Sequence, residues 1–287
     1  MSRRACLAWD AGRQESHRRN RTAGIAQQGN VVGKVLAVTN QKGGVGKTTT
    51  CVNLAASLGL QGRKVLLIDL DPQGNATTGS GVNKGKLAHT VCDWLIDAVP
   101  LDRVLVHTDT YDLLPANSDV TAAEVALLGE EGAEQRLRTV LAGARGSFDY
   151  VLIDCPPTLN MLTINALVAA DAVLIPVQCE FYALEGLTGL LETIEGVRTR
   201  ANPGLYIEGL LRTMYDPRTG LTRDVSRQLI AHFGARVYRT VIPRNVRLAE
   251  APSHGLPIAC YDRASRGSAA YEALAVEVIR HSETERV

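Results

Sequence analysis

Short runs of apolar, β-prone residues recur along the chain, separated by longer stretches whose apolar positions have helical spacing. The stretch from Thr48 to Leu60 is one of these, with Val52 and Leu58 among its apolar residues before Gly62 ends it. The expected strands are Lys34–Val38, Val65–Ile68, Leu113–Leu114, Tyr150–Ile153, Ala172–Val177, Leu205–Met214 and Arg239–Ile242. This alternation predicts an α/β fold, with a mostly parallel twisted sheet flanked by helices on both faces.

The length of 287 residues, with 45% hydrophobic content, is enough to bury the core of one large domain. We expect residues 34–287 to form that single domain. No apolar run approaches the roughly 18 to 20 residues that span a bilayer, and no apolar secretory signal stands near Met1. A cytoplasmic protein is therefore expected.

Residues 1–33 contain six arginines and few apolar side chains, so we expect a flexible basic extension without a core. One interpretation is an arm that helps to bind nucleic acid. Another is an artefact of an early start codon, with the natural start near Val31 or Val32. A transit peptide is a third, weakened by Asp10 and Glu15.

A phosphate-binding loop follows the first expected strand. Gly46, Lys47 and Thr48 match the end of the P-loop pattern G-x-x-x-x-G-K-[ST], while Gln41 stands where the first glycine belongs. In such a loop the backbone N–H groups and the lysine hold phosphates, the hydroxyl ligates Mg²⁺, and the next helix adds its N-terminal dipole. The predicted nucleotide site consists of Lys42, Gly43, Gly44, Val45, Gly46, Lys47, Thr48 and Thr49.

Lys42 adds a second lysine to the loop, which makes it the deviant form of the Walker A motif. One lysine is enough to grip a nucleotide, so Lys42 needs a separate function. With Gly43 and Gly44 it also supplies an alternative turn around the phosphates.

Two acids follow expected strands at the edge where ligands of open α/β sheets bind. Asp71 precedes a proline and is suited to orient an attacking water or to hold a water bound to Mg²⁺. Asp154 ends an apolar run like that of a Walker B element, whose acid reaches Mg²⁺ through water. Loop and acids in this order predict a P-loop NTPase-like ATP and Mg²⁺ site.

The net charge of +1 conceals an uneven distribution along the chain. From Val35 to Glu195 there are 10 Lys/Arg and 19 Asp/Glu, whereas Gly196 to Gly267 has 12 arginines and 5 acids. An arginine-rich stretch favours phosphate contacts, although a solvated basic face is the plainer interpretation. The six cysteines are scattered singly, which indicates reduced thiols and not zinc ligands.

The sequence resembles the ParA/Soj family of deviant-Walker ATPases from Lys34 to about Ile279. The matching runs are Asn40 to Thr50, Asp71 to Asn75, Leu162 to Leu167, Pro176 to Leu187 and Val241 to Gly255.

The resemblance implies a weak ATPase whose ATP-bound subunits form a homodimer, with Lys42 reaching across to the phosphates of the partner. Lys47 and Thr48 would bind phosphate and Mg²⁺, and Asp71 would position the attacking water. Asp154 would hold the metal through water. Hydrolysis would separate the dimer.

The resemblance further implies non-specific binding of the dimer to double-stranded DNA through Arg218 and Arg247, on the nucleoid. Pro243 and Asn245 match positions that line the adenine pocket of the family, although a helix-capping or turn role suits Asn245 equally. A ParB-type centromere-binding partner would stimulate hydrolysis, and the implied function is chromosome or plasmid partitioning.

Two alternatives use the same loop. A nucleotide-gated DNA-binding regulator of replication initiation or transcription would share all these residues, so the sequence does not separate it from a partitioning ATPase. A membrane-cycling ATPase of the MinD type would need a basic amphipathic tail. Ala270 to Val287 has four acids and two arginines, so no membrane binding is expected.

Overall fold

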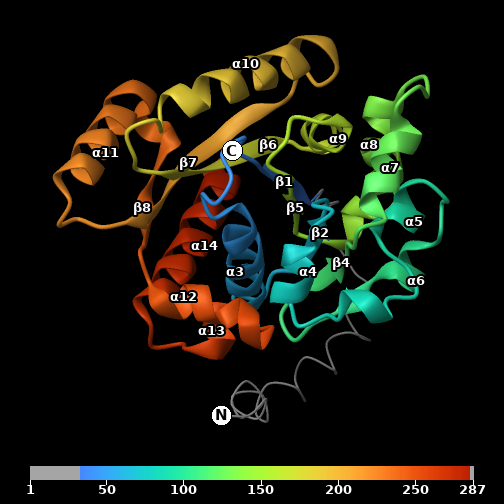
Figure 1. Ribbon diagram of the computed structural model, residues 1–287, viewed down its shortest axis with the longest axis horizontal. Helices are drawn as coiled ribbons and strands as arrows, with labels where there is room; N and C mark the ends of the chain where they lie inside the picture. Colours follow the sequence, from blue (N-terminus) through green and yellow to red (C-terminus); the bar gives the residue numbers. More distant parts are fainter. Residues whose placement is uncertain (1–32, 285–287) are drawn as a thin grey trace. The chain divides into compact units, whose positions relative to one another are not determined.

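One eight-stranded sheet forms the centre of the described residues, 33–284, of this computed structural model (Figure 1). The strands are β1 (Lys34–Val38), β2 (Val65–Asp69), β3 (Val106–His107), β4 (Asp112–Leu114), β5 (Tyr150–Asp154), β6 (Ala172–Gln178), β7 (Tyr206–Tyr215) and β8 (Val237–Pro243). They lie in the order β3-β4-β2-β5-β1-β6-β7-β8, and all neighbours are parallel except β3 and β4. The predicted mostly parallel sheet is confirmed.

Helices cover both faces of the sheet, and each layer buries its own hydrophobic cluster. One face carries α3 (Lys47–Leu60), α4 (Asn75–Gly79), α12 (Val246–Glu250), α13 (Ile258–Tyr261) and α14 (Arg266–Thr284). The other carries α5 (Val91–Leu95), α6 (Leu101–Val104), α7 (Val120–Leu127), α8 (Arg136–Ala142), α9 (Met161–Ala169), α10 (Glu185–Arg200) and α11 (Gly220–Phe233). The 3₁₀ turns are η1 (Lys84–Lys86), η2 (Ala133–Gln135), η3 (Arg145–Ser147), η4 (Gly234–Arg236) and η5 (Ala251–His254).

The side chains of the strands alternate between the two clusters. In β1, Val35 and Ala37 belong to the cluster beneath α9 and α10, whereas Leu36 and Val38 belong to the cluster beneath α3 and α14. Successive residues of a strand point to opposite faces, so a strand covered on both sides must be apolar throughout. This is why the strands appear in the sequence as unbroken apolar runs.

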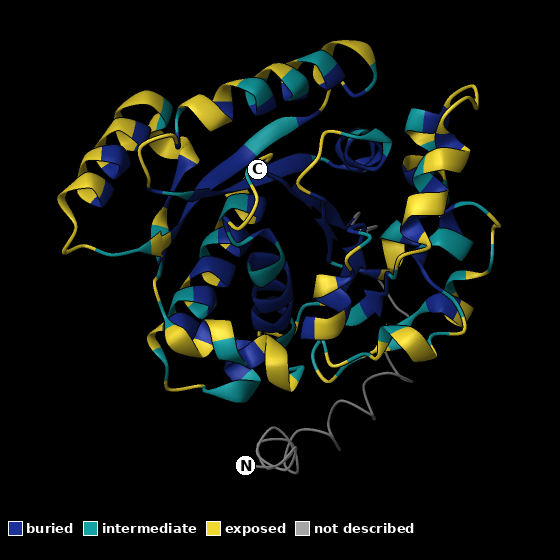
Figure 2. Cartoon of the chain, in the orientation of Figure 1, coloured by how far each residue is buried: buried dark blue, intermediate teal, exposed yellow. Residues whose placement is uncertain are grey.

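The helix α3 packs against the sheet and against α14 beside it, and most of its surface is buried (Figure 2). Leu54, Ala55 and Leu58 have no exposed surface. A helix that is small or apolar nearly all round belongs in the interior. Its N-terminus, which follows the glycine-rich loop, is therefore held in a fixed place at the carboxyl edge of the sheet.

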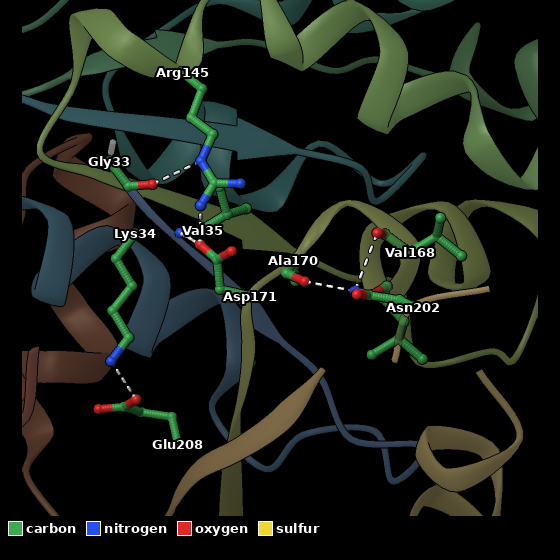
Figure 3. A network of polar contacts seen from close by, with 10 residues as sticks. Gly33, Lys34, Val35, Arg145, Val168, Ala170, Asp171, Asn202 and Glu208 are labelled. Atoms are coloured by element: carbon green, nitrogen blue, oxygen red, sulfur yellow. Dashed lines mark hydrogen bonds and ion pairs between the residues drawn. The ribbon is translucent and has the colours of Figure 1, made fainter. Parts of the chain in front are cut away.

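A polar network joins the amino ends of the strands, at the edge opposite the glycine-rich loop (Figure 3). Asp171, which precedes β6, accepts hydrogen bonds from the backbone N–H of Val35 at 2.8 Å and from Arg145 Nη2 at 2.5 Å. Asn202, which precedes β7, donates to three backbone carbonyls at the end of α9. These contacts fix the starts of β1, β6 and β7 relative to one another.

The sequence did not predict the strand β3, and most of the predicted N-terminal extension lies outside the described residues. The short strand β3 pairs antiparallel with β4 and was not predicted, because two residues are too few to show a pattern. The predicted extension, residues 1–33, lies outside the described residues except for Gly33, whose carbonyl accepts a hydrogen bond from Arg145. Among helices within residues 33–284, none combines the length and apolarity needed to cross a membrane.

Candidate functional site

The loop between β1 and α3 is held at its two ends and left open in its middle. The side chain of Asn40 donates to the carbonyl of Pro176 at 2.8 Å and accepts from Lys42 N at 3.0 Å. At the other end, Thr213 Oγ1 of β7 donates to the carbonyl of Val45 at 2.8 Å. Gly46, the N-cap of α3, has φ of 89°, a left-handed conformation that favours glycine. The anchored turn therefore presents its backbone and a helix N-terminus at one place, as phosphate binding requires.

Lys47 lies under this loop and is only 7% exposed. Its Nζ donates one hydrogen bond, to the carbonyl of Lys42 at 3.3 Å. Burial lowers the pKa of Lys47, and the nearby charge of Asp154 opposes that shift. An ammonium has three donors, so the group can also bind phosphate oxygens at the loop.

The acids Asp69 and Asp154 lie side by side at the ends of β2 and β5, where they are register partners. Both are fully buried on the α3 side of the sheet, because each lies two residues after a leucine, Leu67 or Leu152, of the cluster on that face. Burial, partly offset by hydrogen bonds from Thr77, raises the pKa of Asp69 to about 6. Burial and the charge of Asp69 raise the pKa of Asp154 to about 8.

The two acids differ in their hydrogen bonds. Asp69 Oδ2 accepts from the backbone N–H and the hydroxyl of Thr77, at 2.8 and 2.7 Å, and Oδ1 accepts from Asp71 N at 3.2 Å. Asp154 Oδ1 accepts from Cys51 Sγ at 3.4 Å, whereas Oδ2 has no partner among the described residues. Asp69 is thus committed to shaping the loop after β2, and Asp154 retains a free acceptor.

The oxygen Oδ2 of Asp154, unpaired within residues 33–284, shows whether these residues suit a metal ion. Mg²⁺ in nucleotide sites keeps several waters and takes one or two protein oxygens together with phosphates. The hydroxyl of Thr48 faces Asp154 and lowers its pKa. In residues 33–284, no three His, Cys, Asp or Glu side chains gather to enclose a metal. Thr48 as ligand and Asp154 Oδ2 as acceptor for a metal-bound water fit Mg²⁺.

Asp71 lies in the turn after β2 and is 8% exposed. Its Oδ1 accepts a hydrogen bond from Gln73 N at 2.9 Å, which closes the turn. The charge of Asp71 acts on Lys47, so the structure brings this predicted residue to the loop. Lys84 donates to the carbonyl of Gln73 at 2.5 Å and ties the turn to the neighbouring segment.

Lys42 differs from Lys47 in its surroundings, because its side chain is 36% exposed. Its Nζ forms an ion pair with Glu180 Oε2 at 2.8 Å. Gln178 Nε2, at the end of β6, donates to the other oxygen of Glu180 at 2.5 Å. The ammonium of Lys42 therefore lies at the surface, within reach of a second molecule.

Arg218 and Arg247 are also at the surface, with side chains 88% and 55% exposed. Arg218 binds both oxygens of Asp216, at 2.8 and 2.9 Å, and thereby lowers the pKa of Asp216 to about 2. Arg247 Nη1 pairs with Glu250 Oε2 at 2.9 Å, and its Nε lies 3.5 Å from Asp262 Oδ2. Ion pairs this exposed exchange readily with other anions.

Pro243 ends β8, and Asn245 is the N-cap of α12. Asn245 Oδ1 accepts hydrogen bonds from Arg247 N at 2.8 Å and Leu248 N at 3.3 Å. The capping role that the sequence left open for Asn245 is confirmed. The adenine-pocket role of Pro243 and Asn245 stays a prediction.

Two contributors to this site were missed from the sequence. Glu180 is distant from Lys42 in the chain and carries no local signal. Cys51 lies one helical turn after Lys47, so helical spacing placed it on the side of α3 that faces the site. That spacing was the signal that could have found it.

Comparisons with known proteins cover most of the chain. A family model described as an AAA domain matches residues 33–207. An uncharacterised protein of Pseudomonas putida is 61% identical over 249 residues, which are 86% of this chain and 95% of that protein. The sporulation initiation inhibitor protein Soj of Bacillus subtilis is 51% identical, over 86% of this chain and 98% of its own length. The chromosome partitioning protein ParA of Caulobacter vibrioides is 51% identical, over 86% and 94%.

Solved structures show the same similarity. A Mycobacterium smegmatis protein described as cobyrinic acid a,c-diamide synthase, crystallised with an ATP analogue and magnesium, has a TM-score of 0.78 and 42% identity. The match covers 88% of this chain and 97% of that one. The cell division ATPase MinD of Pyrococcus furiosus has a TM-score of 0.70 and 26% identity, with 86% and 99% covered.

Proposed function

The chain belongs to the ParA/Soj family of chromosome-partitioning ATPases, and we propose on that premise that it is an ATP-driven switch that partitions DNA. ATP binding joins two copies face to face, the dimer binds DNA without sequence preference, and slow hydrolysis releases it. The observation that carries the proposal is the contrast between the loop lysines. Lys47 is buried near Asp154 and Asp71, whereas Lys42 is partly exposed and paired with Glu180 at the surface.

Within one subunit, the loop from Lys42 to Thr49 binds the phosphates of ATP, and Lys47 neutralises their charge. Thr48 would offer its hydroxyl to Mg²⁺, and Asp154 would hold a metal-bound water through Oδ2. The ATP analogue and magnesium in the Mycobacterium smegmatis structure support this assignment. Mg²⁺ would supply charge neutralisation between the phosphates.

Asp71 orients the attacking water. Its place at the start of the turn after β2, near Lys47, supports this role. Its backbone N–H is fixed by Asp69, which is itself held by Thr77, so the carboxylate is supported by a rigid turn. Positioning of water by one carboxylate, without a dedicated base in the described part of the site, suits slow turnover.

Lys42 reaches the phosphates of the partner subunit in the dimer. It must first leave Glu180, to which it is bound within its own chain. Positive charge then arrives at the terminal phosphate only in the dimer, so nucleotide state and dimer state are coupled. Loss of that phosphate on hydrolysis removes the shared contact and separates the subunits.

DNA binds through Arg218 and Arg247, which exchange their exposed carboxylate partners for backbone phosphates. Binding of this kind weakens as salt rises. Pro243 and Asn245 line the adenine pocket. A ParB-type partner stimulates hydrolysis, and the protein works in the cytoplasm on the nucleoid. Residues 34–287 act as one ATPase domain, and residues 1–33 as a basic extension.

Binding to non-specific duplex DNA, measured without nucleotide, with ADP and with ATP, tests this function. The expected result is salt-sensitive binding with ATP only, above the concentration at which the ATP dimer forms. Equal binding in all three states, or none in any, would contradict a nucleotide-gated DNA switch.

A further inference from the structure

Cys51 is a thiol at the centre of the candidate site to which no role has yet been given. It lies in the first turns of α3, has no exposed surface, and donates from Sγ to Asp154 Oδ1 at 3.4 Å. With the hydroxyl of Thr48, which also lowers the pKa of Asp154, the thiol is one of two side-chain donors that act on this carboxyl group. Cys51 therefore contacts the acid whose free oxygen fits a metal site.

The hydrogen bond limits how Asp154 can turn. The terminal torsion of an aspartate is broad and roughly two-fold, so an unbound carboxylate exchanges its oxygens and samples many planes. A donor on Oδ1 fixes the plane and assigns the second oxygen, Oδ2, to the open side. Carboxylates that serve metal sites are commonly held in this way by a further hydrogen bond.

The neighbouring acid explains why Asp154 needs such a donor. Asp69 has three hydrogen bonds from Thr77 and Asp71, which hold both of its oxygens. Asp154 lies beside it on the next strand, and its Oδ2 has no hydrogen-bond partner within residues 33–284. The donor on the α3 side therefore fixes the direction of the Asp154 carboxyl group, which its own strand does not hold.

The thiol is suited to this place because α3 is buried and its backbone does not move easily. Cysteine packs as a small hydrophobic side chain and still has a proton to donate. A donor on a rigid helix can orient its acceptor, whereas a donor on a loop would move with it.

We propose that Cys51 is a positioning residue for the Mg²⁺ site, orienting Asp154 so that Oδ2 receives a metal-bound water. The inference rests on the proposed function, since it needs a nucleotide with Mg²⁺ at this loop. It predicts that removing the thiol donor weakens the response to Mg²⁺ and leaves the grip of the loop on the nucleotide itself intact.

The test is titration of the full-length protein with fluorescent ADP, first in EDTA and then at increasing MgCl₂. For Cys51→Ala, the Mg²⁺ concentration that gives half of the gain in nucleotide affinity should rise about tenfold, the lower end of the range for such supporting contacts. Affinity in EDTA should match that of the wild type, because the thiol contacts Asp154 and does not hold the nucleotide itself.

Cys51→Ser keeps a donor of similar size, so this variant should respond to Mg²⁺ as the wild type does. Ser57→Ala is the matched control, because Ser57 is buried on the same helix and its hydroxyl has no partner among the described residues. Cys51→Val is a second variant without a donor, for use if the alanine variant melts early in EDTA.

Three results would overturn the inference: an unchanged Mg²⁺ requirement in Cys51→Ala, equal defects in the alanine and serine variants, or an equal loss of affinity in EDTA. If the wild type gains nothing from Mg²⁺, the proposed nucleotide site fails with it. A normal wild type with a normal Cys51→Ala removes only the role of Cys51.

Discussion

Lys47 donates a hydrogen bond from Nζ to the backbone carbonyl of Lys42, so the two lysines of the loop are joined while their side chains point to different surroundings. The ammonium of Lys47 is buried near Asp154 and Asp71, whereas that of Lys42 is paired with Glu180 at the surface. Substitutions at the two positions should therefore have separable effects.

Lys42→Ala should keep nucleotide binding and lose the ATP-dependent dimer. The buried Lys47 still meets the phosphates, but no cation crosses to the partner. Light scattering with a non-hydrolysable ATP analogue measures the dimer, and fluorescent nucleotide measures binding. Lys86→Ala, which removes an exposed lysine outside the loop, is the control. An intact dimer in Lys42→Ala would rule out the cross-subunit role.

Asp71→Ala should lower ATP turnover by about 100-fold or more, the usual contribution of a positioned acid or base. Because the phosphates and Lys42 are untouched, the ATP dimer should persist and accumulate. Phosphate release gives the rate, and gel filtration with ATP gives the dimer. Asp102→Ala removes an exposed acid as the control. Turnover at the wild-type rate would exclude Asp71 from the chemical step.

The stability of the nucleotide-free protein should fall as the pH rises from about 5 to about 8, the pKa to which burial and Asp69 raise Asp154. Burial and the charge of Asp69 raise that pKa, so the folded state keeps a proton that the unfolded state has lost. The free energy of unfolding then decreases with pH, by at most about 1.4 kcal/mol per pH unit for one carboxyl. Above that pKa the dependence should level off.

Asp154→Asn removes a carboxyl group whose ionised form is disfavoured in the folded state. The melting temperature of this variant should therefore be higher than that of the wild type at pH 8 and should depend less on pH. Thermal melts without nucleotide from pH 5 to 8 test this, with Asp102→Asn as the matched exposed control. A wild type whose melting temperature rises over this range would mean that Asp154 is ionised in the folded protein.

Arg218→Glu combined with Arg247→Glu should abolish DNA binding and preserve the ATP dimer, because both side chains are exposed and lie outside the loop. Fluorescence anisotropy of labelled duplex DNA with ATP measures the loss. The control is Arg198→Glu with Arg227→Glu. These arginines are exposed and paired with nearby acids in the same way. Equal losses in both variants would indicate a general effect of charge, and not contacts at defined positions.

The parts of the fold that depend on local pattern were predictable from the sequence. The run Lys34–Val38 became β1 with the same bounds, since a strand buried on both faces must be apolar. The glycine loop and its helix followed from residue types that only one kind of turn uses. Even the pairing of Arg247 with Glu250 follows helical spacing, although it was not predicted.

The parts that depend on strand order were not predictable. Asp69 and Asp154 are neighbours only because β5 enters the sheet next to β2, and each acid alone ends an ordinary apolar run. Glu180 meets Lys42 because β6 lies on the other side of β1. The sequence of one segment alone does not predict these contacts between strands. The contacts nevertheless determine the electrostatics of the site.

The two ends of β1 are held differently, because the backbone N–H of Val35 at its start donates a hydrogen bond to Asp171. At its start, the amide is held by a carboxylate that Arg145 also binds, and at its finish the chain passes into a turn built on glycines with positive φ. The strand is fully buried from Val35 to Val38 and is paired on both sides from Leu36 to Val38, so its local opening should cost far more free energy than opening of the loop that follows. Rearrangement of the glycine loop should therefore not spread into β1. The amide hydrogens of β1 should stay protected from exchange while the loop moves.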